Sequence, residues 1–232
     1  MPNKYPRQLY PLTCLFIIFF LALNTACQFQ RGRVSQIKPT NFKPRKIVVV
    51  GFRPAMSQDE DPGVIRSPVS GAVFMAEPIP QDVTDKMTSK LFSRLVEYEG
   101  YELIGPNKAT GAIESLLSSD KDMSDIEIFH RVGQLFSADA VIVGYIFRWR
   151  DRDGTEYSVN RPASAAFELD LLRPEDNAIM WKGRFDKTQT SLSENLLDME
   201  TFIKGKGQWM TVDRLAELGL DDLLDNFFLA SR

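Results

Sequence analysis

The chain has few residues that serve as soft nucleophiles, proton carriers or metal ligands. Its 232 residues include two cysteines, Cys14 and Cys27, and one histidine, His130. Catalysis by an activated nucleophile needs a neighbouring base, and zinc sites need several converging ligands. The G-x-x-x-x-G-K-[ST] and G-x-S-x-G spacings of phosphate loops and serine hydrolases are also missing. We therefore expect no catalytic residue, no metal site and no cofactor, and interpret His130 as a packing or surface residue of a helix.

Charge of one sign is not concentrated either. The formal net charge is −3 at pH 7, which gives no electrostatic footprint for binding nucleic acid. Two small acidic groups, residues 59–61 and the pair Asp151 and Asp153, are weak candidates for metal ligands. We interpret both as solvated loop charge.

The first 27 residues contain an export pattern. Lys4 and Arg7 precede an apolar run of 12 residues, Leu12 to Leu23, and short residues lead from there to Cys27. A positive start, an apolar stretch and a small-residue cleavage site are typical of a secretory signal. As a helix the run spans about 18 Å, well short of a hydrocarbon core of about 30 Å. We expect residues 1–26 to be a signal peptide rather than a transmembrane anchor.

The segment Leu23-Asn24-Thr25-Ala26-Cys27 resembles the lipobox of bacterial lipoproteins. The resemblance implies cleavage between Ala26 and Cys27, a diacylglycerol on the Cys27 thiol and further acylation of the new amino end, for example with palmitate. Two or more acyl chains hold a protein stably on a lipid bilayer. Gln28 stands where the family's inner-membrane proteins have Asp, so the outer membrane, facing the periplasm, is the expected location. The alternative is an ordinary secreted protein.

Residues 27–45 have the composition of a lipidated basic tether. They contain several cations, two prolines, no acidic residue and no apolar periodicity. The simplest interpretation is a flexible spacer. The alternative is electrostatic contact with anionic lipid headgroups or an anionic cell-wall polymer.

Residues 46–232 show the patterns of an α/β domain with a C-terminal helical extension. Apolar runs and alternations predict strands at 46–52, 101–104, 140–150, 164–171 and 179–185. Helical periodicity and capping residues predict helices over 81–98, from Asn107, after Ser124, over 192–203 and from Thr211, with an interruption at Gly219. The early helical crossovers imply parallel strands, and the later short turns imply antiparallel ones. The expected fold is a mixed parallel and antiparallel sheet packed with helices.

One long segment of this domain is a candidate binding surface. Residues 53–80 form a long segment with five prolines, and segments of this length are often functional or disordered. Its uncharged stretch makes Val69, Val73, Phe74 and Met75 candidate partner contacts, unless the stretch packs on its own domain.

Charged residues alternate along two of the predicted strands. Tyr145, Phe147 and Trp149 are expected on one side of the long strand and its arginines on the other. Pairing of those arginines with Glu168 and Asp170 across the ladder would give a solvated sheet face.

Three segments carry a second resemblance: Lys46–Phe52, Ser137–Gly144 and Asn177–Gly183. They resemble the curli-secretion lipoprotein superfamily, the N-terminal domain of the Tol-Pal translocation protein and the lipoprotein activators of penicillin-binding proteins. This resemblance implies the fold of that superfamily over about residues 46–186. The tail from Phe185 onward is similar to uncharacterised lipoproteins of deltaproteobacteria, which imply no activity.

Together these features predict a non-catalytic lipoprotein, anchored in the cell envelope, that binds a protein or cell-wall partner. Two alternatives stay open. One is a subunit of an outer-membrane secretion pore like the curli channel, and the other is a cell-wall hydrolase that uses carboxylates alone. The sequence leaves the oligomeric state open.

Overall fold

A computed structural model describes residues 42–190 and 208–230 of the chain. The predicted signal peptide, lipidated cysteine and most of the tether lie outside the described residues. So does the predicted helix over 192–203.

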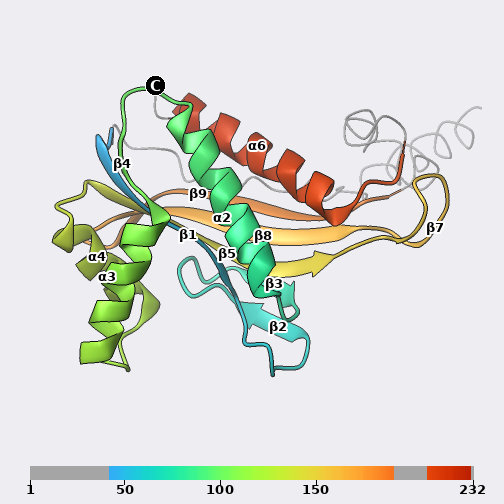
Figure 1. Ribbon diagram of the computed structural model, residues 1–232, viewed down its shortest axis with the longest axis horizontal. Coiled ribbons are helices and arrows are strands. Elements are labelled where there is room, and N and C mark those ends of the chain that lie inside the picture. Colours follow the sequence, from blue (N-terminus) through green and yellow to red (C-terminus); the bar gives the residue numbers. More distant parts are fainter. Residues whose placement is uncertain (1–41, 191–207, 231–232) are drawn as a thin grey trace, which may run out of the picture. The chain divides into compact units, whose positions relative to one another are not determined.

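A five-stranded mixed sheet organises the described residues (Figure 1). Its strand order is β4 (Glu102–Ile104), β1 (Lys46–Pro54), β5 (Ala140–Arg150), β8 (Ser164–Arg173) and β9 (Ala178–Thr188). β1 pairs in parallel with β4 and β5, whereas β5, β8 and β9 pair antiparallel. The predicted α/β class with a mixed sheet is confirmed. The helical crossovers produce the parallel pairs, and the short turn after β8 produces an antiparallel pair.

Helices cover both faces of this sheet. α2 (Gln81–Val96) and α6 (Val212–Ala230) share one hydrophobic core with the sheet, called here the α2 core. α3 (Pro106–Ser119) and α4 (Asp125–Leu135) share the other, called here the α3 core. In β1, Ile47 and Val49 enter the α2 core, and Val48 and Val50 enter the α3 core. A strand that is buried on both faces reads as a continuous apolar run, as predicted.

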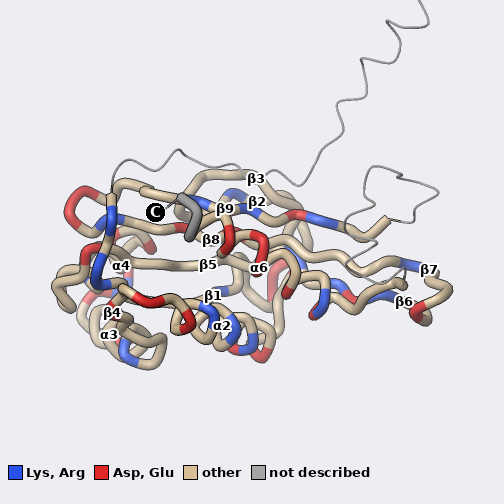
Figure 2. The backbone as a smooth tube through the Cα atoms, turned by 90° about the horizontal axis from the view of Figure 1, so that it is seen from above, with Lys and Arg blue, Asp and Glu red and all other residues tan. Residues whose placement is uncertain are grey.

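Three ion pairs run along the contact between α2 and α6. Each joins a cation of α2 to a carboxylate of α6, and both partners advance by four residues: Lys86–Asp213 at 3.6 Å, Lys90–Glu217 at 3.4 Å and Arg94–Asp221 at 2.9 Å. Because both members advance together, the two helices run in parallel. Figure 2 shows basic positions in blue along α2 and acidic positions in red along α6. Exposed pairs contribute little energy each, so their main effect is on the register of α6 against α2.

One predicted helix cap is confirmed, and one predicted helix start is wrong. Ser124 Oγ accepts the Glu127 N–H, which confirms the predicted cap of α4. α3, however, starts at Pro106 rather than after Asn107, because the missing N–H and fixed φ of proline suit the first helical position.

The predicted start of α6 is confirmed, but the interruption predicted in its middle is absent. Thr211 Oγ1 accepts the Arg214 N–H, as a cap should. The helix then passes through Gly219 without interruption. A Cβ at Gly219 would lie 2.6 Å from the Phe185 ring, so glycine is required there for close packing rather than for a break.

Two short hairpins complete the fold. β2 (Gly63–Arg66) and β3 (Val73–Ala76) form an antiparallel hairpin inside the segment over 53–80. β6 (Asp153–Gly154) and β7 (Val159–Arg161) form the other. The longer hairpin went unpredicted because each strand has four residues, too few for a periodic signal.

Candidate binding surfaces

The inner face of the β2–β3 hairpin is fixed to the sheet by Phe74. Its ring is 2% exposed and stacks on Phe147 with 3.7 Å between centroids and 9° between planes. The Arg184 guanidinium lies 3.9 Å from the Phe74 ring centroid and also donates to the Val73 carbonyl at 2.9 Å. The aromatic stack and the cation over the ring therefore hold the hairpin in one orientation.

The outer face of the same hairpin is apolar and exposed. Val64, Val73 and Met75 are 67%, 44% and 56% exposed. Val64 pairs directly with Met75, and Val73 pairs with the exposed Arg66. Successive strand residues point to opposite faces, so the alternation that buries Phe74 and Ala76 also exposes these three side chains. We call Val64, Val73 and Met75 the hairpin patch.

The four candidate contacts of residues 69–76 therefore divide between the two faces. Val73 and Met75 belong to the hairpin patch, whereas Val69 and Phe74 are buried in the α3 core. Sequence reasoning missed Val64. Only the pairing across the hairpin brings it beside Met75, and the two lie eleven positions apart in the chain.

The loop that joins β2 to β3 lies over a buried carboxylate. Ser67 Oγ donates to Glu168 Oε1 at 2.5 Å, and Ser70 Oγ donates to Glu168 Oε2 at 2.6 Å. Each carboxylate oxygen therefore receives one hydroxyl from the loop. The expected solvated face of β8 is wrong, because Glu168 is buried beneath this loop.

Asp170 lies two residues farther along β8, on the same face, and is completely buried. Neither of its carboxyl oxygens has a hydrogen-bond partner among the described residues. Burial, followed by the neighbouring Glu168 charge, holds the pKa of Asp170 well above its usual range. Nearby, the Tyr145 hydroxyl donates to the Asp125 carboxylate, and burial raises the pKa of that tyrosine.

The arginines of β5 have other partners than the two expected carboxylates. Arg148 pairs with Asp186 at 2.6 Å, and Arg150 pairs with Glu77 at 2.6 Å. A bulge between Ile146 and Arg148 shifts the register against β8. The strict alternation predicted for this strand is therefore wrong beyond the bulge.

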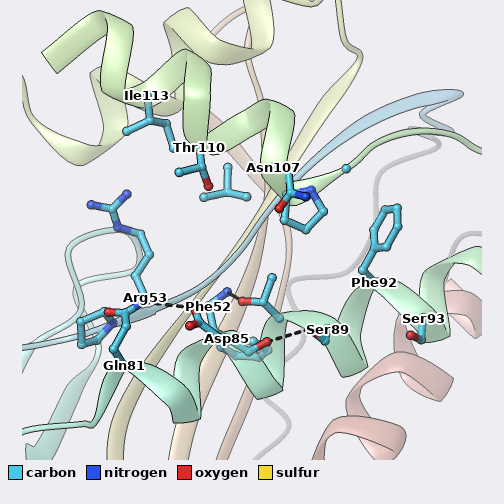
Figure 3. Close-up of a pocket in the computed structure, with 15 residues that line it drawn as sticks. Phe52, Arg53, Gln81, Asp85, Ser89, Phe92, Ser93, Asn107, Thr110 and Ile113 are labelled. Carbon is cyan, nitrogen blue, oxygen red and sulfur yellow. Dashed lines mark hydrogen bonds between the residues drawn. The ribbon is translucent and has the colours of Figure 1, made fainter. Parts of the chain in front are cut away.

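A groove runs between α2 and α3 beside the end of β1 (Figure 3). Its volume is about 720 Å³. It exists because β4 has only three residues and pairs with Lys46 to Val48, so the rest of β1 has no strand on that side. Side chains four residues apart on α2 form one wall, and Asn107 and Thr110 of α3 lie opposite.

Several polar groups of the groove bond to one another. Gln81 Nε2 donates to Asp85 Oδ1 at 3.1 Å, and Ser89 Oγ donates to the Asp85 carbonyl at 2.9 Å. Arg53 reaches across toward the α3 wall (Figure 3). One cation and one carboxylate thus balance the lining, which can donate and accept hydrogen bonds but contains no histidine or cysteine.

The free edge of β1 in this groove is protected against strand addition. The Phe52 N–H donates to Thr88 Oγ1 at 2.8 Å, and Pro54 has no N–H to offer. The contact with Thr88 requires Gly51, whose φ is +88° and whose added Cβ would lie 2.3 Å from Thr88 Cγ2. Blocking an edge with side chains and proline is a common means of preventing edge-to-edge pairing.

The other residues considered as candidate catalytic groups or metal ligands, His130 and Asp151, lie within or beside helices. His130 lies on α4, and its Nδ1 is buried without a partner among the described residues. Asp151 Oδ1 accepts the Val212 N–H at 3.0 Å and so caps α6. Over residues 42–190 and 208–230, no group of three or more His, Cys, Asp or Glu side chains is placed to hold a metal ion. Within the same ranges, no helix combines the length and apolar character needed to cross a bilayer.

The chain is similar to several solved bacterial structures. Lipoprotein GNA1162 from Neisseria meningitidis is 17% identical, with a TM-score of 0.37, and the match covers 69% of this chain and 94% of that one. The LpoB C-terminal domain from Escherichia coli is 12% identical, with a TM-score of 0.38 and coverages of 66% and 90%. The hypothetical protein CT253 from Chlamydia trachomatis is 11% identical, with a TM-score of 0.42 and coverages of 79% and 95%. No protein-family model matches the chain, and no curated protein matches it in sequence.

Proposed function

We propose that this protein is a non-catalytic lipoprotein of the bacterial cell envelope that binds a protein partner through the hairpin patch. The observation that carries the proposal is the exposure of Val64, Val73 and Met75 side by side on a hairpin whose other face is locked to the sheet. Clustered apolar side chains on a surface commonly mark interaction sites.

The way the hairpin is held supports a binding role. Binding to a mobile loop costs conformational entropy because the loop must become ordered, whereas binding to a fixed surface avoids much of that cost. Phe74 and the two hydroxyl contacts to Glu168 fix the β2–β3 hairpin from below. Arg66, beside Val73, supplies a polar edge to the patch, and interfaces usually combine an apolar centre with a polar rim.

The anchoring part of the proposal rests on the sequence. An acylated Cys27 would hold the domain at the outer membrane, on the periplasmic side, through a tether that ends near the first described residue, Phe42. Fifteen residues reach at most about 50 Å when extended. The start of the folded domain would therefore lie within that distance of the bilayer, and the partner would belong to the outer membrane or the cell wall.

Replacing two residues of the hairpin patch should strongly lower partner recovery without affecting the fold. In the anchored full-length protein, the double variant Val73→Thr/Met75→Gln should lower crosslinked partner recovery at least tenfold. Thermal unfolding should stay nearly unchanged, because exposed substitutions usually alter stability by less than about 0.5 kcal/mol. The matched control is Val96→Thr/Leu135→Gln, since these side chains are 59% and 64% exposed elsewhere. Equal recovery by both double variants would refute the contact role.

Replacing the predicted lipid-bearing cysteine should release the protein from the membrane. Cys27→Ser removes the thiol that would carry the diacylglycerol, and buried acyl chains are what hold such a protein on a bilayer. We expect loss of fatty-acid labelling and a shift from the membrane pellet to the soluble fraction. Cys14→Ser is the control, because Cys14 lies inside the predicted signal. A Cys27→Ser protein that still carries label and sediments with membranes contradicts the assignment.

A further inference from the structure

The loop between β2 and β3 is organised around the buried carboxylate beneath it. The Ser67 N–H donates to the Ala72 carbonyl at 2.8 Å, and the Gly71 N–H donates to the Ser67 carbonyl at 3.1 Å. Ser67 Oγ also accepts the Ser70 N–H at 3.1 Å while it donates to Glu168. The loop conformation and its contact with Glu168 therefore depend on the same hydroxyl.

On this face of β8, the two carboxyl groups are unevenly satisfied. Glu168 accepts a hydroxyl on each oxygen, whereas Asp170 has no partner on either. An ionised carboxylate without a partner is very costly in a dry interior, so Asp170 is protonated in the closed structure. Asp170 then adds no charge beside Glu168.

The charged groups around this pair come from four other elements. Lys182 of β9, directly across from Asp170, favours its ionised form, but it makes no ion pair with Asp170 within 4 Å in the described residues. Arg184, across from Glu168, is engaged by Asp186 and by the Phe74 ring. The remaining groups are Tyr145 of β5, Asp125 of α4 and Arg53 of β1.

We propose that the loop over residues 67–72 is a latch that stays closed over Glu168 while Asp170 carries a proton and opens when that proton is lost. The latch would regulate how the hairpin patch is presented, and in that respect it rests on the proposed function. A second negative charge beside Glu168 has no counter-charge in contact. Opening the loop admits water to Glu168 and so weakens the repulsion between the two carboxylates.

The direction of the effect follows from proton linkage. The closed loop favours protonated Asp170, and the open loop tolerates the ionised form. Between the pKa of Asp170 in the open loop and its higher pKa in the closed loop, each pH unit therefore shifts the closing equilibrium by up to tenfold toward the open state, and above the closed-loop pKa the shift levels off. Acid has no such effect through Asp170, because the group is already neutral.

Hydrogen exchange of the full-length protein in detergent tests the latch without any partner. We would measure the protection of the Ser67, Gly71 and Ala72 amides between pH 6 and 9, corrected for the intrinsic rate of exchange. In the native protein we expect protection to fall with rising pH, by up to tenfold per unit, while the Ala55 amide, which donates to Ile146, stays protected. In Asp170→Asn the protection of the loop should not change with pH.

Two further variants keep the test decisive. Ser70→Ala removes one of the two hydroxyls and should lower loop protection at every pH. Asp176→Asn, in the exposed turn between β8 and β9, is the matched carboxylate control and should behave as the native protein does. A native loop with pH-independent protection, or an Asp170→Asn loop with the native pH dependence, overturns the latch. Loss of partner recovery in the patch variant bears only on the proposed function, because that variant leaves the loop unchanged.

Discussion

Phe74→Ala should destabilise the protein by about 3–5 kcal/mol, the usual cost of truncating a buried phenylalanine. Phe74 loses its stack on Phe147 and leaves the Arg184 guanidinium without the ring beneath it. The cavity opens where the hairpin meets the sheet, so the surrounding core cannot close over it without moving β3. Chemical denaturation followed by tryptophan fluorescence measures the change in the free energy of unfolding.

The neighbouring residue provides the control for this prediction. Val73 belongs to the same strand but faces outward, so Val73→Ala should cost little. Phe74→Leu keeps most of the apolar volume and should fall between the two. If Phe74→Ala and Val73→Ala destabilise equally, the hairpin is not held by its inner face, and the argument for a rigid patch fails.

The main strands and helices could be predicted because their signals are local. The apolar run of β1 and the periodicity of α2 depend on neighbours within a few residues. The hairpin could not be predicted, because its strands become stable only when Phe74 reaches Phe147, 73 positions away. Whether a short strand forms depends on the residues that it packs against, and these residues lie far away in the sequence.

The character of β8 shows a second limit. Its alternation correctly assigned Phe167 and Leu169 to one face and Glu168 and Asp170 to the other. Alternation does not reveal what covers a face, and charged residues usually indicate water. Here a loop from the segment over 53–80 covers Glu168, and only the tertiary contact from Ser67 to Glu168 shows it.

The other features that could not be predicted depend on the register of the strands. The groove beside β1 depends on β4 ending at Ile104, opposite Val48. The side on which Trp149 packs depends on the bulge in β5, which brings this residue against the α2 core instead of beside Phe147. A shift of one residue moves a side chain to the other face, and no pattern in the sequence marks where the shift occurs.

Asp170 should make the whole domain less stable as the pH rises. Its pKa is raised in the folded state above that of an unfolded aspartate, so the folded form binds a proton that the unfolded form releases. The stabilisation is complete below the unfolded pKa of about 3.9 and is lost as the pH rises toward and through the folded pKa. The free energy of unfolding should fall by up to about 1.4 kcal/mol per pH unit in that window from this group alone.

Asp170→Asn should remove this slope, because the amide does not titrate. The stability of the variant relative to the native protein should therefore increase steadily from pH 4 to pH 8, as measured by denaturation at each pH. Asp170→Leu tests the cost of burying a polar group at all, since it removes the unpartnered oxygens along with the charge. If the relative stability of Asp170→Asn is the same at pH 4 and pH 8, then Asp170 is ionised or solvated in the folded protein. The loop over residues 67–72 would then lack the buried proton on which its closure is proposed to depend.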